Sequence, residues 1–383
     1  MKKNVIIYGL SALAVLLLVI SCPGCSGIKA GVNKITDAFT NPTAREVYAR
    51  EFDGNKNELA QWEAAYAAAQ HDSLEIPLPY GEKGTFSPYR NFVYSYTINL
   101  QEGEVLEVAV DKDSLSQRVF IDAFQKRDAD FELMESSKPG ETSLSVPIKE
   151  TGMYKVILQS EMAAATGFLI TINKQPLFDF PVAGRGNADI GSFWGMERDG
   201  GKRRHEGIDI FAQRGTPVVA VTDGVIGYTG ERGLGGRQVW LRTAVFGSSL
   251  YYAHLDSIAV TNGQRVTTGD TLGFVGNTGN ARFTPPHLHF GIYKRGAVNP
   301  LPYVYKTGEV NKTGYPQSFT TASLSVKSRA NLRQGPSTQT KVIDTLSAND
   351  TVALLGQHND WLHIQTPGGQ KAFLHKSLAN KLE

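Results

Sequence analysis

Hydrophobic and polar positions alternate over long stretches of the chain, and this pattern predicts strands. The alternation runs without a break through residues 92–100, where aromatic and aliphatic side chains occupy every second position. It recurs at residues 106–110 and 144–148, and glycine-containing turns separate these segments at the spacing of a sandwich. We therefore predict a β-sandwich over residues 85–175, an accessory domain without a cluster of metal ligands or nucleophiles.

Before the sandwich, apolar residues recur at helical spacing over residues 42–75. Thr43 and Glu46 have the spacing of a capping box, which marks the start of a helix. A second helix over residues 57–70 places its apolar side chains, Trp62 among them, on one face. We interpret these helices as a hairpin packed on its neighbour, in preference to a coiled coil that binds a partner.

The chemistry-bearing residues are concentrated in a central block, residues 180–300. Four of the eight histidines lie there, in three short segments that each have a strand-like pattern. These segments contain His205 with Asp209, His254, and His287 with His289. Strand residues two or four apart point to the same face, so the first and last segments each present a pair of side chains to one surface.

Histidines and a carboxylate on one surface make a candidate catalytic zinc site. Zinc takes neutral imidazole and carboxylate ligands, and a hydrolytic site uses three protein ligands with the fourth position left for water. The candidates therefore suffice for the ligands and for an acid or base. A competing interpretation makes His205-Glu206-x-x-Asp209 a helical site similar to H-E-x-x-H, with Glu206 as the general base. Gly207 and β-branched Ile208 disfavour a helix there.

Five motifs follow one another in this block. They are His-Glu-Gly-Ile-Asp at 205–209, Arg-Gly-Thr-Pro-Val at 214–218, Tyr-Ala-His-Leu at 252–255, Gly-Asn-Thr-Gly at 276–279 and Pro-His-Leu-His-Phe at 286–290. Together they resemble the lysostaphin-type (LytM-like) zinc endopeptidases, which cut peptidoglycan cross-links. The resemblance implies an antiparallel β-sheet peptidase domain over residues 176–305.

The same resemblance assigns roles to the five candidate residues. It implies three ligands of one Zn²⁺ ion per chain, which are His205, Asp209 and His289, and two catalytic histidines, which are His254 and His287. Two nearby positions depart from the family's pattern, Pro285 before the last motif and Gly291 after it. Neither is a ligand position, so we expect a changed cleft shape with the metal retained.

The end of the chain has the pattern of a second, smaller β domain. Segments 329–337, 361–364 and 373–378 resemble the bacterial SH3-like domain in order and spacing. The resemblance implies a small β-barrel over residues 321–383, after a linker at 306–320, which binds wall peptides or fixes an enzyme on its substrate. The histidines of this barrel lack the spacing of metal ligands, and we predict surface or strand positions for His358, His363 and His375.

The start of the chain has the features of a bacterial lipoprotein signal peptide. Two lysines precede an apolar run at residues 5–20, shorter than the ~20 residues that span a bilayer, and the residues ending at Cys22 resemble a lipobox. We expect a signal peptide over residues 1–21, a lipid on Cys22 and a tether over residues 22–41. By analogy, the lipid places the protein in the bacterial envelope, in the outer membrane facing the periplasm.

Composition excludes several classes of protein. The chain has 39 basic and 37 acidic residues, and removal of the signal peptide leaves 37 of each, so there is no electrostatic case for binding nucleic acid. Both cysteines lie near the N-terminus, which leaves no disulfide framework and no thiol nucleophile in a folded domain. The G-x-S-x-G motif of serine hydrolases is absent.

The predicted fold is therefore mainly β and multidomain: a short helical hairpin, a β-sandwich, a LytM-like peptidase domain and an SH3-like β-barrel. The predicted function is a lipid-anchored zinc metalloendopeptidase that hydrolyses peptide cross-links of peptidoglycan. One alternative is a non-catalytic LytM-like scaffold that activates a cell-wall amidase, and another is a wall-adhesion lipoprotein. All five site positions are intact, which favours the enzyme. Inhibition of the cleft by the N-terminal region stays open.

Overall fold

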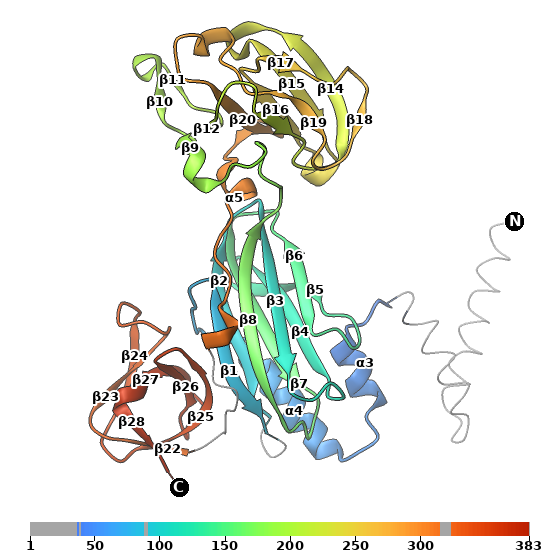
Figure 1. Ribbon diagram of the computed structural model, residues 1–383. Coiled ribbons are helices and arrows are strands. Elements are labelled where there is room, and N and C mark those ends of the chain that lie inside the picture. Colours follow the sequence, from blue (N-terminus) through green and yellow to red (C-terminus); the bar gives the residue numbers. More distant parts are fainter. Residues whose placement is uncertain (1–36, 38–39, 88–90, 315–322, 383) are drawn as a thin grey trace, which may run out of the picture. The chain divides into compact units, whose positions relative to one another are not determined.

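The computed structural model describes residue 37 and residues 40–87, 91–314 and 323–382 (Figure 1). The described part is mainly β, with antiparallel sheets, which confirms the predicted fold class. The predicted signal peptide and the lipid site at Cys22 lie outside the described residues. Within those ranges, no helix is both long and apolar enough to cross a bilayer.

The chain divides into two compact units, residues 1–59 and 60–383. The first unit contains helix α3 (Ala44–Glu51). The side chain of Thr43 accepts a hydrogen bond from the backbone N–H of Glu46 at 3.2 Å, and the Glu46 carboxylate accepts one from the N–H of Thr43 at 2.7 Å. The predicted capping box is therefore present.

The second unit begins within helix α4 (Lys56–Ala69), which buries an aromatic face as its pattern predicts. The indole N–H of Trp62 donates to the carbonyl of Ser160 at 2.9 Å, and its ring packs edge-on against Phe120. Tyr66 donates to the buried carboxylate of Asp122. These contacts fix the end of α4 on the sandwich.

The sandwich consists of two antiparallel sheets, in which β1-β8-β3-β6 and β2-β7-β4-β5 are neighbours. Its strands are β1 (Tyr80–Phe86), β2 (Val93–Leu100), β3 (Glu104–Lys112), β4 (Val119–Arg127), β5 (Asp130–Ser136), β6 (Ser143–Pro147), β7 (Gly152–Ser160) and β8 (Thr166–Pro176). Strand β1 begins before residue 85, where we expected the domain to start. Its sequence, Tyr-Gly-Glu-Lys-Gly-Thr-Phe, does not alternate apolar and polar residues, although almost all of it is buried.

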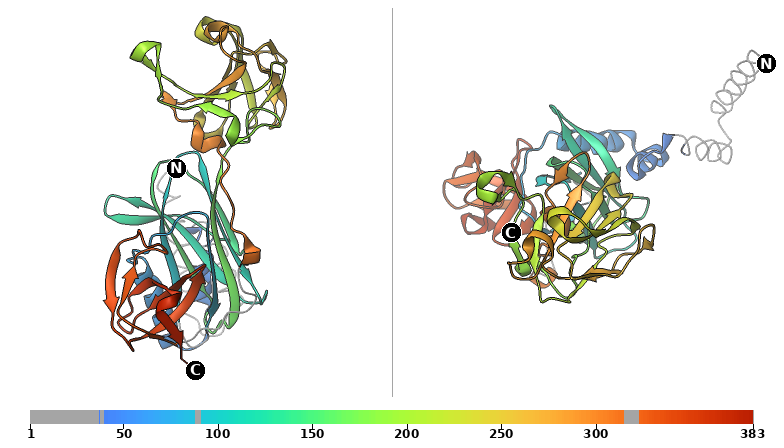
Figure 2. Two further views of the ribbon diagram at one scale, coloured as in Figure 1. Left: turned by 60° about the vertical axis from the view of Figure 1, so that its left-hand side comes forward. Right: turned by 90° about the horizontal axis from the view of Figure 1, so that it is seen from above.

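The central domain is built on a curved sheet with strand order β18-β14-β15-β16-β20-β12-β9, and a three-stranded sheet, β13-β19-β17, accompanies it (Figures 1 and 2). Its elements are β9 (Ile190–Ser192), β10 (Glu197–Arg198), β11 (Arg203–Arg204), β12 (Ile208–Phe211), β13 (Pro217–Val219), β14 (Gly224–Glu231), β15 (Arg237–Arg242), β16 (Ser249–Ala253), β17 (Ser257–Ile258), β18 (Arg265–Val266), β19 (Thr271–Phe274), β20 (His287–Tyr293), β21 (Ala297–Val298) and α5 (Leu301–Val304). Apolar side chains such as Leu241, Tyr252 and Phe290 fill its core. This packing leaves the opposite face of β12 and β20 for polar residues.

The C-terminal barrel has its own apolar core. Its strands are β22 (Ser323–Val326), β23 (Ala330–Arg333), β24 (Val342–Leu346), β25 (Thr351–His358), β26 (Trp361–Gln365), β27 (Lys371–His375) and β28 (Ala379–Lys381). Strand β25 also pairs with β1 of the sandwich, with Gly84 opposite Gly356. A Cβ atom on Gly84 would lie 2.8 Å from a β25 carbonyl oxygen, so the missing side chain allows this approach.

A buried polar cluster lies beside the β1–β25 pairing. Glu82 on β1 and His363 on β26 are both fully buried, and His363 Nδ1 lies 2.9 Å from a Glu82 carboxylate oxygen. Tyr80 and Tyr96 donate their hydroxyl hydrogens to the other oxygen of Glu82. Burial would raise the pKa of Glu82, but the facing imidazole and these hydrogen bonds outweigh it and lower the pKa. His363 is thus a strand residue, but its pairing with Glu82 was not expected.

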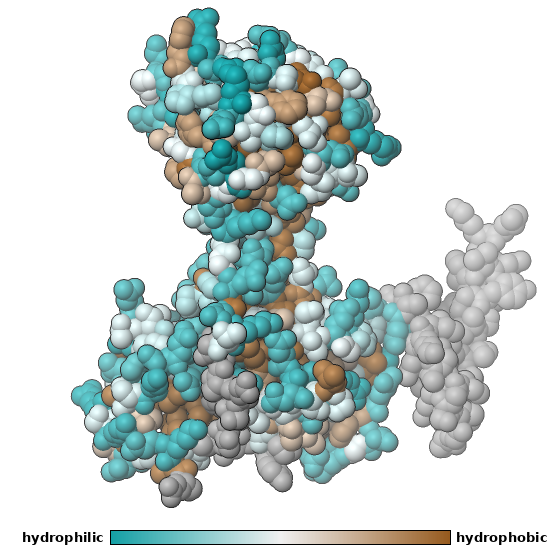
Figure 3. All heavy atoms as spheres, in the orientation of Figure 1, coloured by the Kyte–Doolittle hydropathy of each residue, from teal (hydrophilic) through white to brown (hydrophobic). Residues whose placement is uncertain are grey.

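The surface drawn in Figure 3 is mostly hydrophilic, and its hydrophobic areas are small and scattered. Most apolar side chains of the described residues lie in the hydrophobic cores or pack against them.

Candidate metal centre

Pairing of β12 with β20 places two of the predicted ligands side by side. The two strands are antiparallel, and Asp209 lies directly opposite His289. His205 differs from our expectation, because it precedes β12 in a segment that is not a strand. Its backbone N–H donates to the carbonyl of Met196 at 2.8 Å, and its carbonyl accepts from the N–H of Gly195 at 2.9 Å. The turn before β10 thus holds His205 beside the strand pair.

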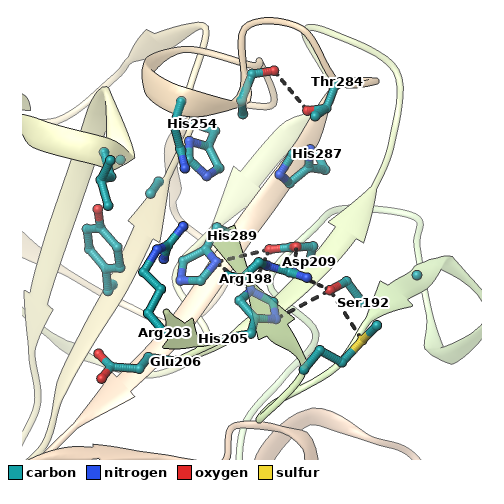
Figure 4. Close-up of a pocket in the computed structure, with 18 of the residues that line it drawn as sticks. Ser192, Arg198, Arg203, His205, Glu206, Asp209, His254, Thr284, His287 and His289 are labelled. Carbon is teal, nitrogen blue, oxygen red and sulfur yellow. Dashed lines mark hydrogen bonds and ion pairs between the residues drawn. The ribbon is translucent and has the colours of Figure 1, made fainter. Parts of the chain in front are cut away.

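Three side-chain atoms from these residues face one another (Figure 4). His205 Nε2 lies 3.0 Å from Asp209 Oδ1 and 3.0 Å from His289 Nδ1, and the last two atoms are also 3.0 Å apart. Ligands of a tetrahedral zinc ion at its usual bond lengths would lie about 3.3 Å apart. Among the residues that the structure describes, these three form the one such group of potential metal ligands. Their chemistry and spacing fit a zinc ion.

Neighbouring groups fix how each ligand is presented. His205 Nδ1 lies 2.9 Å from the carbonyl oxygen of Phe193 and donates its hydrogen there, which leaves Nε2 as the free lone pair. Burial would raise the pKa of Asp209, but the facing imidazoles of His205 and His289 outweigh it and lower the pKa. Burial is the largest cause that lowers the pKa of His289. A neutral imidazole and an ionised carboxylate are the forms in which such side chains bind metal.

His254 and His287 lie next to the ligand group without joining it (Figure 4). Their ring centroids are 5.1 Å apart. Each ring donates its Nδ1 hydrogen to a backbone carbonyl at 2.9 Å, His254 to Thr278 and His287 to Pro285. Pro285, one of the two departures from the family's pattern, therefore orients His287 through its carbonyl. The Nε2 atom of each ring remains available to accept a proton.

The backbone of His254 has an uncommon conformation. His254 follows the last residue of β16, and its φ of 64° lies in the left-handed region, which a residue with a side chain rarely adopts. Its N–H donates to the carbonyl of Gly235 at 2.8 Å, which holds this conformation. Burial first, and then the neighbouring histidines, lower the pKa of His254 to about 4. The ring is therefore neutral at pH 7.

The five residues line a cleft of about 830 Å³. Its walls also carry Arg198, Arg203, Leu234, Tyr251, Thr284 and Tyr293. Glu206 lies on the wall, where its carboxylate is 3.5 Å from the hydroxyl of Tyr293, and it does not belong to the ligand group. Because β12 is a strand and the residues before it are not helical, the helical interpretation of this segment is wrong.

Sequence reasoning assigned no role at the centre to two polar residues, Ser192 and Arg198. A guanidinium nitrogen of Arg198 donates to Asp209 Oδ2 at 2.9 Å and also to the hydroxyl of Ser192. Neither residue has a spacing that marks it as a ligand. The hydrogen bonds depend on pairings of β9 with β12 and of β10 with β11, which a motif does not contain.

A His-Asp-His group of potential metal ligands thus lies at the β12–β20 strand pair, with two further histidines beside it. Residues 203–300 match the family model described as Peptidase family M23, and residues 328–379 match the model described as Bacterial SH3 domain. The chain thus contains an M23 (LytM-type) domain and a bacterial SH3 domain, which confirms both resemblances.

Relatives of the chain are similar to it over this region. It is 39% identical over 123 residues to an L-Ala--D-Glu endopeptidase of Bacillus subtilis. The matched region covers 30% of this chain and 37% of the relative. It is 42% identical over 111 residues to the DD-carboxypeptidase/endopeptidase Mpg of Neisseria meningitidis, 29% of this chain and 25% of the relative. Identity to the peptidoglycan DD-endopeptidase ShyC of Vibrio cholerae is 36% over 120 residues, 29% of this chain and 26% of the relative. The chain thus spans well under half the length of these relatives.

Proposed function

We propose that this protein is a lipid-anchored zinc metalloendopeptidase of the bacterial envelope that hydrolyses peptide cross-links of peptidoglycan. The observation that carries the proposal is the mutual 3.0 Å spacing of His205 Nε2, Asp209 Oδ1 and His289 Nδ1 beside two further histidines. The endopeptidase names of the relatives support the substrate class. A non-catalytic scaffold has no need of this complete set.

The chemistry of the site follows from its residues. When bound, zinc would acidify a water molecule and polarise the scissile carbonyl. His254 and His287 each hold Nδ1 against a backbone carbonyl, which leaves Nε2 for the substrate, so one ring can accept the proton of the water while the other stabilises the developing charge or protonates the leaving amine. The buried carboxylate of Asp209 would offset part of the charge of a bound metal ion.

The remaining parts of the proposal concern location. The lipobox at Cys22 supports an anchor in the outer membrane, facing the periplasm. The SH3 domain supports retention on the wall, because the family resemblance implies binding of wall peptides. Both ideas place the cleft near peptidoglycan.

Removal of the metal is expected to abolish cleavage. With the purified protein and purified sacculi, a chelator such as 1,10-phenanthroline should stop the fall in turbidity, and added Zn²⁺ should restore it, because the imidazoles alone cannot acidify water. Circular dichroism before and after chelation serves as the control for folding. Cleavage that continues at full rate in metal-free protein would contradict the proposal.

Glu206→Gln is expected to leave kcat/KM within about twofold of the wild-type value, since such a change removes no transition-state interaction. The carboxylate lies beside Tyr293 and outside the ligand group, and the amide has the same shape. Hydrolysis of a defined cross-linked muropeptide measures this value. A loss of more than a hundredfold would return Glu206 to the role of general base.

A further inference from the structure

Arg198 contacts the carboxylate oxygen of Asp209 that does not face the histidines. Asp209 Oδ1 faces both imidazoles, whereas Oδ2 accepts a hydrogen bond from Arg198 at 2.9 Å. We propose that Arg198 is a positioning residue of the metal centre, which holds Asp209 so that it offers one oxygen, Oδ1, to the metal and keeps Oδ2 occupied. This inference rests on the proposed metal-dependent function.

The hairpin β10–β11 is built to deliver this side chain. Its turn contains Gly200 and Gly201, whose φ values of 67° and 88° suit glycine, and this allows the two short strands to pair closely. Arg203 lies directly opposite Arg198 in that pairing. Its ion pair, however, is with Asp199 on the same hairpin. The two arginines are cross-strand neighbours with different partners. Arg198 contacts Asp209, a proposed metal ligand, whereas Arg203 contacts Asp199, which is not one.

Arg198 also connects two ligands through Ser192. Ser192 is the residue of β9 that lies opposite Asp209 on β12. Its hydroxyl accepts a hydrogen bond from Arg198 and lies 3.3 Å from His205 Nδ1. One guanidinium therefore contacts one proposed ligand, Asp209, directly and a second, His205, through the hydroxyl of Ser192.

Two opposing effects determine the consequence for metal affinity. The positive charge of Arg198 repels a divalent cation, which weakens binding, whereas the hydrogen bond orients Asp209, which strengthens it. The Asp209 side chain is only 11% exposed, so without Arg198 its second oxygen would have little solvent to replace the lost bond. Groups that orient metal ligands contribute about 10-fold to 100-fold to affinity when measured by mutation. We conclude that orientation outweighs repulsion here.

The test measures metal binding without any substrate. Zinc affinity of the full-length protein is measured by competition with a chromophoric chelator for the wild type, Arg198→Met, Arg198→Lys and the matched control Arg203→Met. We expect Arg198→Met to weaken binding by about 10-fold to 100-fold, Arg198→Lys to recover part of the loss, and Arg203→Met to match the wild type. The visible spectrum of the Co²⁺-loaded protein should change in Arg198→Met alone, because Asp209 can then offer both oxygens to the metal.

The outcomes separate this inference from the proposed function. If Arg198→Met binds zinc as tightly as the wild type and its cobalt spectrum is unchanged, the positioning role of Arg198 is wrong while the peptidase proposal stands. Equal losses in Arg198→Met and Arg203→Met would also overturn it, since they would reflect damage to the hairpin. A wild-type protein that binds no zinc would overturn both.

Discussion

Replacing His289 with alanine is expected to lower kcat/KM for peptidoglycan cross-links by at least about a thousandfold, equivalent to about 4 kcal/mol of transition-state stabilisation. His289 supplies one of three facing ligand atoms, and its Nδ1 lies 3.0 Å from both Asp209 Oδ1 and His205 Nε2. With two ligands left, zinc binding should weaken strongly, and the means of acidifying water goes with it. Turnover of a cross-linked muropeptide, followed by chromatography, measures the effect.

The matched control is His71→Ala, which removes an exposed imidazole outside the central domain. It should leave turnover and bound zinc unchanged. Melting temperatures of both variants exclude unfolding as the cause of a loss. A His289→Ala protein that retains a tenth or more of the activity would contradict the assignment of the metal centre.

Glu82→Ala is expected to lower the stability of the sandwich and barrel by about 3–5 kcal/mol, the usual cost of breaking a buried pair by removing one partner. Alanine would remove the carboxylate that accepts the hydroxyl hydrogens of Tyr80 and Tyr96 and that faces the buried imidazole of His363. For a unit of this size the loss corresponds to a fall of roughly 6–20 °C in melting temperature. Differential scanning calorimetry of the whole protein measures it.

The calorimetric result should be specific to one part of the chain. The transition of the sandwich and barrel should move, while that of the central domain should stay, because Glu82 contacts the barrel and its own sandwich. Glu107→Ala, on an exposed position of β3, is the control and should change stability by less than about 0.5 kcal/mol. If Glu82→Ala and Glu107→Ala have the same melting temperatures, the buried Glu82–His363 pair does not stabilise the association of sandwich and barrel.

The candidate centre was largely accessible from sequence because its residues lie within short motifs. His287 and His289 are two apart on one strand, so a period of two places them on the same face. Asp209 lies opposite His289 because of the register of β12 against β20. These residues are 80 positions apart, so their spacing in the sequence does not reveal the contact. Arg198 was missed for the same reason, since its contact arises from strand pairing and not from spacing.

The pairing of β1 with β25, and the contact of Glu82 with His363 beside it, were also not predicted from the sequence. The residues involved do not follow the alternation of apolar and polar positions that predicts a buried strand. Strand β1 carries Glu82 in a buried position, although a charged residue there indicates a loop or a solvent-facing site. His363 lies in a strand whose alternation places it on the barrel surface, which is also the surface that β1 covers. Such a buried pair can be recognised only when the positions of both residues in the fold are known, because Glu82 and His363 are far apart in the sequence.

The central claim is best tested by digesting purified sacculi with the zinc-loaded protein and identifying the released muropeptides by mass spectrometry. Wild-type protein and His289→Ala are compared under the same conditions. The account predicts that the wild type releases fragments cut at one type of peptide bond, with glycan strands intact, and that His289→Ala releases none. Zinc-loaded protein that leaves the sacculi uncut, or fragments that appear equally with His289→Ala, would contradict it.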